Sequence, residues 1–110
     1  MKLWIDDVRP APEGYVWCKT TFDALRMIYN HYKSIEEISL DHDAGESHYY
    51  GSDFIEVLKE MERISRSPFW SSVYKEAFMQ YKFFLHSANP VGVANMRAII
   101  EKNGWKEIKE

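Results

Sequence analysis

Three short apolar runs of this 110-residue sequence end in side chains that bind metals or transfer protons. Asp6 and Asp7 follow the first run, an Asp-His-Asp triplet begins at Asp41 after the second, and His86 follows the third. Carboxylates bind hard divalent cations, and imidazoles accept or donate protons near neutral pH. The predicted metal ligands are Asp6, Asp7, Asp41 and Asp43, and the predicted catalytic residues are Asp41, His42, His86 and Ser87.

Candidate phosphate ligands lie beside the same segments. Arg9 follows the acidic pair, and a guanidinium holds a phosphate through two parallel N–H groups. Asn89 before Pro90 is a favourable helix cap, so the backbone amides that follow, including that of Gly92, would point at an anion. The predicted ligand-binding residues are Arg9, Asn89 and Gly92.

The elements that position these residues follow from the apolar spacing. The short runs have the length and composition of buried strands, whereas Phe22 to Tyr32 repeats apolar side chains at helical spacing after a capping Thr20 or Thr21. Ser52 begins a second helix, and residues 69–79 form a short extra one. The predicted strands are 2–5, 15–19, 35–40, 82–85 and 105–108, and the last helix begins at Pro90. The aromatic residues predicted for the core are Trp4, Trp17, Phe22, Phe54, Phe83 and Trp105.

Strands that alternate with helices predict a single α/β domain over residues 1–110. We expect an open, mostly parallel five-stranded sheet with helices on both faces and a reduced helix set, because Arg9 to Gly14 between the first two strands has the prolines and glycine of a loop. Ligands bind such sheets outside the carboxyl ends of the strands. If the first, third and fourth strands are neighbours, the acids and histidines share one crevice.

Four carboxylates in one crevice repel one another, so either some are protonated or a cation neutralises them. Oxygen ligands favour Mg²⁺, Ca²⁺ or Mn²⁺, and the histidines also allow Zn²⁺. Each segment also has a structural interpretation. Asp7 would pair with Arg9, the aspartates of the second segment would cap a turn, and His86 would be a core histidine. Their coincidence at one edge favours a functional site.

The composition excludes several classes of protein. A sequence with 45% hydrophobic and 28% charged residues is typical of a globular domain. The net charge of −3 disfavours general nucleic-acid binding, which needs a basic surface. The lone Cys18 excludes an internal disulfide, and its apolar neighbours predict a buried thiol. We expect no membrane association and a cytoplasmic location, because neither a membrane span nor a signal peptide is evident.

Three motifs carry a resemblance to a known family. They are Leu3–Gly14 (LWIDDVRPAPEG), Ile38–Gly45 (ISLDHDAG) and His86–Gly92 (HSANPVG). In this order they resemble the cyclic-phosphate processing receiver-like family, over nearly the whole chain. The resemblance implies a receiver-like, flavodoxin-like fold whose signalling pocket serves cyclic or other phosphate-containing nucleotides.

Compared with ordinary receivers, the resemblance gives several residues a role. Asp6 and Asp7 match the metal-binding acidic pair, Asp41 matches the phosphoacceptor, and Ser87 matches the hydroxyl residue of the fourth strand. The final strand offers no match to the receiver lysine, and the last receiver helix has no counterpart. His42 and His86 are additional to the receiver pattern, and they are proton-transfer groups that a hydrolase would use.

The leading hypothesis is a metal-dependent phosphoesterase with Mg²⁺ or Mn²⁺ as cofactor and a small phosphorylated nucleotide as ligand. Asp41 would be either a metal ligand or a nucleophile, and His42 and His86 would act as acid or base. The alternatives are a receiver-like module that binds a nucleotide without turnover and a protein-interaction domain.

Overall fold

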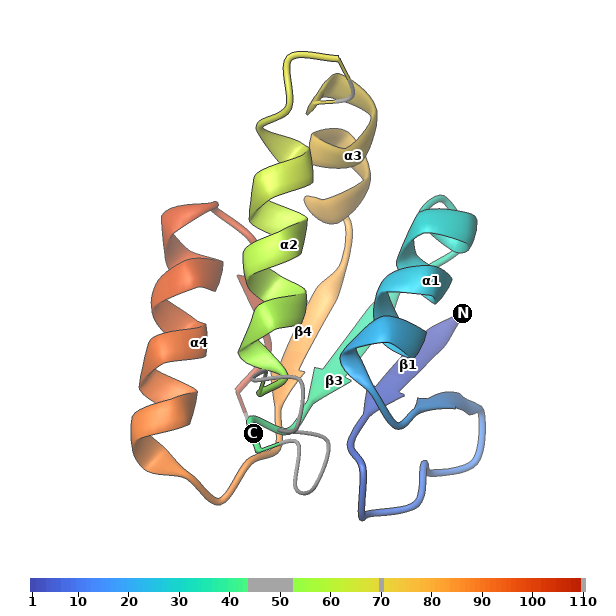
Figure 1. Cartoon of the computed structure of the whole chain (residues 1–110), viewed down its shortest axis with the longest axis vertical. Helices are drawn as coiled ribbons and strands as arrows, with labels where there is room; N and C mark the ends of the chain where they lie inside the picture. The colour runs from blue at the N-terminus through green and yellow to red at the C-terminus, as the bar shows by residue number, and fades with distance from the viewer. Residues whose placement is uncertain (44–52, 70, 110) are drawn as a thin grey trace.

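Strands and helices follow one another in the order that the sequence predicts. The computed structural model describes residues 1–43, 53–69 and 71–109 (Figure 1). The strands are β1 (Lys2–Ile5), β2 (Tyr15–Cys18), β3 (Glu37–Leu40), β4 (Lys82–Leu85) and β5 (Lys106–Glu107). The helices are α1 (Thr21–His31), α2 (Ile55–Ser65), α3 (Ser71–Phe78) and α4 (Pro90–Lys102). None of these helices is long and apolar enough to cross a lipid bilayer. Ser52, the predicted helix cap, lies outside the described residues.

The sheet is parallel throughout, with the strand order β2-β1-β3-β4-β5. Ile5 at the end of β1 is in register with Cys18 of β2 and with Leu40 of β3. Leu40 is in turn opposite Leu85 of β4. The first, third and fourth strands are therefore neighbours, and the residues that follow them meet at one edge of the sheet.

All four described helices cover the same face of the sheet. The connections from β2 to β3, from β3 to β4 and from β4 to β5 step across the sheet in one direction, and right-handed crossovers place their helices on one side. α2 contacts α1, α3 and α4, and the layer lies in front of the strands in Figure 1. This differs from the expected helices on both faces. The one connection that steps the other way, from β1 to β2, is a loop, so no described helix covers the second face.

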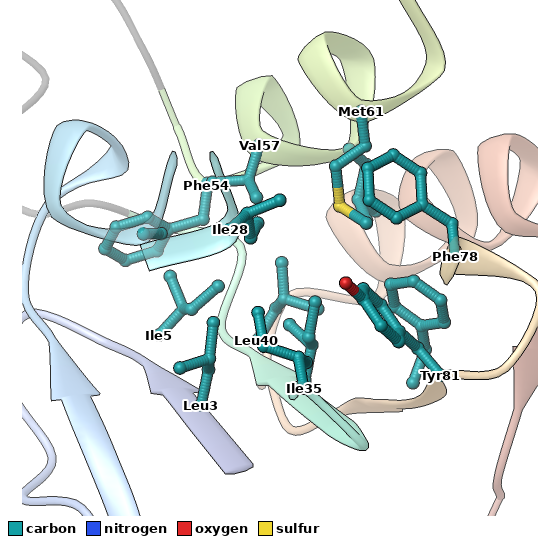
Figure 2. Close-up of a cluster of buried hydrophobic side chains, with 14 of the residues drawn as sticks. Leu3, Ile5, Ile28, Ile35, Leu40, Phe54, Val57, Met61, Phe78 and Tyr81 are labelled. Carbon is teal, nitrogen blue, oxygen red and sulfur yellow. The ribbon is translucent and has the colours of Figure 1, made fainter. Parts of the chain in front are cut away.

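The hydrophobic core lies between the sheet and this helix layer. Leu3 and Ile5 of β1 are fully buried in it, whereas Lys2 and Trp4 alternate with them and point to the other face. The helical side of the cluster includes Ile28, Phe54, Val57, Met61 and Phe78 (Figure 2). Burying each large apolar side chain contributes about 1.5–3 kcal/mol, which holds the helices on this face.

The core prediction for the aromatic residues holds only in part. Phe54, Phe83 and Trp105 are buried. Phe22 is 72% exposed, so its assignment to the core was wrong; it lies in the first turn of α1, where Ala24 and Ile28 form the buried stripe. Trp4 and Trp17 are in register on β1 and β2 and remain partly exposed, because they point to the face without helices.

Candidate metal and phosphate site

The carboxyl ends of β1 and β3 bring three carboxylates together. Asp6 and Asp7 follow β1, and Asp41 follows β3, where its backbone N–H donates to the carbonyl of Ile5 at 2.9 Å. One carboxylate oxygen from each aspartate lies within 4.8 Å of the others. Three of the four predicted metal ligands therefore meet in one place. Three carboxylate oxygens fit a hard cation such as Mg²⁺ or Mn²⁺ that keeps several of its waters.

Asp6 is fully buried, and its carboxylate accepts three hydrogen bonds. Oδ1 accepts the backbone N–H groups of Val8 and Arg9, each at 2.9 Å, and Oδ2 lies 2.9 Å from Nε2 of His86. Burial raises the pKa of Asp6, but these hydrogen bonds lower it by more, so the pKa lies below its usual value. Asp6 is therefore ionised at neutral pH and holds the loop after β1.

The pKa of Asp7 is shifted in the opposite direction to that of Asp6. Burial raises the pKa of Asp7, and the negative charges of Asp6, Asp41 and Asp43 raise it further. Nothing in the described part of the chain pairs this carboxylate with a basic side chain, since Arg9 lies near Asp6 instead, with Nε 3.9 Å from Oδ2. A bound cation would remove the repulsion that Asp7 experiences.

His86 is fixed through both ring nitrogens and through one face of its ring. Nδ1 lies 2.8 Å from Oγ of Ser39, and Nε2 faces Asp6. The ring stacks on Trp4, with the centroids 3.9 Å apart. Burial lowers the pKa of His86, against the effect of the Asp6 carboxylate. Because Asp6 only accepts, Nε2 carries the proton of the neutral ring and Nδ1 accepts the Ser39 hydroxyl.

His42 is oriented by the fourth predicted metal ligand, Asp43. Nδ1 of His42 lies 3.0 Å from Oδ1 of Asp43 and 4.0 Å from Oδ2 of Asp53. The hydrogen bond with His42 lowers the pKa of Asp43. Asp43 therefore belongs to a second group, with His42 and Asp53, rather than to the three clustered carboxylates. Within the described residues Nε2 of His42 has no hydrogen-bond partner.

Gly92 provides the space that the His42 ring occupies. A Cβ at this position would lie 2.3 Å from Cγ of His42 and 2.6 Å from Cδ2, much closer than two carbon atoms approach. The backbone N–H of Gly92 is also in use, because it donates to Oδ1 of the helix cap Asn89 at 3.0 Å. The structure thus places this predicted ligand residue behind His42.

The other predicted phosphate ligands border the acidic cluster and make contacts of their own. Nη1 of Arg9 donates to the backbone carbonyl of His86 at 2.7 Å, which leaves further N–H groups of this half-exposed guanidinium for a ligand. Nδ2 of Asn89 donates to Asp43 at 3.2 Å. Oγ of Ser87 accepts the backbone N–H of Asn89 at 3.1 Å, so its own proton remains available.

A comparison with known families covers all three motifs. The model of the cyclic-phosphate processing receiver domain matches residues 1–102. The chain belongs to this family. No curated protein and no solved structure matches the chain. The match ends with α4, so every site residue of this cyclic-phosphate processing receiver domain lies inside the matched part.

Two residues of the site were not found from the sequence. Ser39 lies inside β3 between Ile38 and Leu40, and the period-two alternation of a strand was the available signal that it points away from the core. Asp53 joins His42 through tertiary structure alone, and no spacing rule connects the two positions.

Proposed function

We propose that this domain is a metal-dependent phosphoesterase that acts on cyclic or other phosphate-containing nucleotides. The cluster of Asp6, Asp7 and Asp41 carries the proposal, because three carboxylates held this close gain from a cation. Membership in a family named for cyclic-phosphate processing supports the substrate class. When bound, Mg²⁺ or Mn²⁺ would neutralise the phosphate oxygens.

His42 is the proposed general base. Its Nδ1–H donates to Asp43, which leaves the lone pair on Nε2. Gly92 leaves the ring room to keep this position. A water molecule that attacks phosphorus would lose its proton to Nε2, while the P–O ester bond on the far side breaks and the leaving oxygen takes a proton from solvent. This arrangement favours His42 over His86, because both nitrogens of His86 are already hydrogen-bonded.

Arg9 and Ser87 are the proposed phosphate ligands. The guanidinium of Arg9 is fixed by the carbonyl of His86 and keeps N–H groups for an anion. The hydroxyl of Ser87 accepts from the backbone of Asn89 and would donate its proton to a phosphate oxygen. Both groups come from loops that follow β1 and β4, on either side of Asp41 at the end of β3.

Hydrolysis of 2′,3′- and 3′,5′-cyclic nucleotides in Mg²⁺, Mn²⁺ or a chelator tests the proposal. We expect turnover only with metal, and a reduction of about 10²-fold or more in kcat for His42→Gln. Asp41→Asn should lose metal binding and turnover together. His31→Gln, at the exposed end of α1, is the matched control and should have the kcat and metal affinity of the wild type. Absence of metal-dependent turnover with every cyclic nucleotide would reject the enzyme.

A nucleotide-binding module without turnover is the second candidate. The contacts of His86 favour it, since this ring is held as a structural link rather than left open. Metal-dependent nucleotide binding with no product formed, and with equal affinity in His42→Gln, would identify this second function.

A further inference from the structure

The sheet face without helices is hollowed next to the acidic cluster. A cavity of about 690 Å³ opens on it, lined by Trp4, Pro12, Tyr15, Phe84, His86 and Ile108 among others. Small-molecule sites have volumes of about 300–1,000 Å³ and mostly apolar walls with a few polar groups. The cavity falls within that range. Of its lining residues, His86 contacts Asp6 of the acidic cluster, and the proposed reaction uses none of the side chains that line it.

Part of the cavity wall is aromatic, formed by Trp4, Tyr15 and Phe84. Trp4 and Tyr15 meet edge to face, with centroids 5.9 Å apart and planes at 76°. Phe84 also lines the cavity and is partly exposed. A partly exposed aromatic ring of this kind stacks on another planar ring. The cavity therefore fits a flat, aromatic group better than a branched aliphatic one.

Polar side chains line the floor of the cavity and one of its ends. Ser39 is 4% exposed, and its Oγ contacts Nδ1 of His86 at the floor. At one end Arg97 donates from Nε and Nη2 to the two carboxylate oxygens of Glu107, at 2.7 and 2.8 Å. Lys109 also lines the cavity and is exposed. A heteroaromatic ring with its own donors and acceptors would find partners here that a hydrocarbon ring would not use.

His86 joins the cavity to the acidic cluster. One ring nitrogen faces Ser39 on the sheet surface, and the other faces Asp6 at the sheet edge. A ligand with an aromatic end and an anionic end would thus span both sites across one side chain. We propose that the cavity binds the nucleobase of a nucleotide whose phosphate lies at the acidic edge, an inference that rests on the proposed function.

A small ligand fits this surface better than a helix of a second protein. The surface is concave, and its aromatic rings are interrupted by the buried hydroxyl of Ser39 and by the Arg97–Glu107 ion pair. A helix docked there would remove water from the Arg97–Glu107 ion pair beneath an apolar surface, which costs free energy. The cavity also reaches His86, which contacts Asp6 of the acidic cluster. A nucleotide has both an aromatic group for the cavity and a phosphate for the acidic edge.

Binding of adenosine and of adenosine 2′,3′-cyclic monophosphate, measured by calorimetry with Mg²⁺, tests the proposal. Phe84→Leu removes the aromatic ring and keeps an apolar residue in β4. Base–aromatic stacking predicts that both ligands bind about tenfold more weakly to this variant, while Mg²⁺ binds equally well. Phe22→Leu makes the same change on α1, away from the cavity, and should have no effect.

A second measurement uses the wild-type protein, so it does not depend on the variant folding. Titration with adenosine should shift the NMR signals of the Trp4 indole N–H and the Phe84 and Ile108 amides, and leave those of α1 unchanged. Shifts elsewhere, equal affinity of Phe84→Leu and wild type, or a dimer formed through this face that adenosine does not dissociate would each overturn the proposal.

Failure of the nucleobase site and failure of the enzyme give different results. Bis(4-nitrophenyl) phosphate carries no nucleobase, so wild type and Phe84→Leu should hydrolyse it at the same rate in Mn²⁺. Hydrolysis of this probe with no effect of Phe84→Leu on the nucleotides overturns the nucleobase site alone. Phe84-dependent binding of adenosine without any hydrolysis keeps the nucleobase site and rejects the phosphoesterase.

Discussion

Nε2 of His86 lies 2.9 Å from Oδ2 of the fully buried Asp6, although 80 residues separate the two along the chain. The contact joins the ends of β1 and β4 across β3, which lies between them. Asp6 also anchors the loop after β1 through the N–H groups of Val8 and Arg9. One of the clustered carboxylates is therefore a structural element as well as a candidate ligand.

Asp6→Asn should destabilise the protein, because the amide loses charge-assisted hydrogen bonds in a buried place. The expected loss is about 1–3 kcal/mol in the free energy of unfolding. The pKa of Asp6 lies below its unfolded value, so its contribution is present above the unfolded pKa and is lost as pH falls through the folded pKa. Urea titrations at pH 7 and pH 3 should show a large difference between variant and wild type at pH 7 and a smaller one at pH 3.

Asp7→Asn should stabilise the metal-free protein, in contrast to Asp6→Asn. The pKa of Asp7 is raised by burial and by its acidic neighbours, so the folded state is penalised while Asp7 is ionised and recovers as pH falls through the folded pKa. In chelator at pH 7 the variant should be more stable, by about 1 kcal/mol or less because solvent screens this group, or a few degrees in Tm. Thermal melts with and without Mn²⁺ measure this, and a lower Tm of the variant in chelator would contradict it.

Gly92→Ala should displace the His42 ring. Alanine is favoured over glycine within a helix by up to about 1 kcal/mol, but its Cβ would occupy the place of Cγ of His42. We expect a lower Tm, a shifted His42 ring signal in the NMR spectrum and the loss of any turnover. Ala94→Gly, on the exposed side of the same helix, is the matched control and should lower Tm without moving the ring signal.

Cys18 should be unreactive in the native protein. It is 1% exposed, and burial raises the pKa of its thiol to about 11. The thiolate is the reactive form, so a disulfide reagent at pH 8 should label unfolded protein in urea and leave folded protein unlabelled. Rapid labelling under native conditions would mean that β2 opens easily at the edge of the sheet.

The fold was predictable because each element carries its own local signal. Thr20 caps α1 by accepting the N–H of Asp23, and Asn89 caps α4, as their sequence contexts indicate. The clean apolar runs specify β1, β3 and β4. The placement of the helices was harder to predict, since it depends on the strand order. β1 pairs with β2 and β3, and no local sequence pattern indicates which strands are its neighbours.

The candidate site was predictable as a set of positions but not as a set of contacts. Strand ends bring Asp6, Asp7 and Asp41 together, as the edge rule predicts. The sequence does not distinguish His42 from His86, because their difference arises from tertiary neighbours. Ser39 and Asp6 take the two ring nitrogens of His86 as hydrogen-bond partners. His42 uses one ring nitrogen for Asp43, and its other nitrogen has no partner among the described residues.

The one-sided helix layer divides the residues of each strand into two groups that can be engineered separately. Along β1, Leu3 and Ile5 support the core, whereas Trp4 between them faces the cavity. Substitutions without shared contacts usually have additive effects on stability. A library confined to Tyr15 and Phe84 would therefore vary the cavity wall against a constant core, and its members should differ in ligand affinity far more than in their unfolding curves.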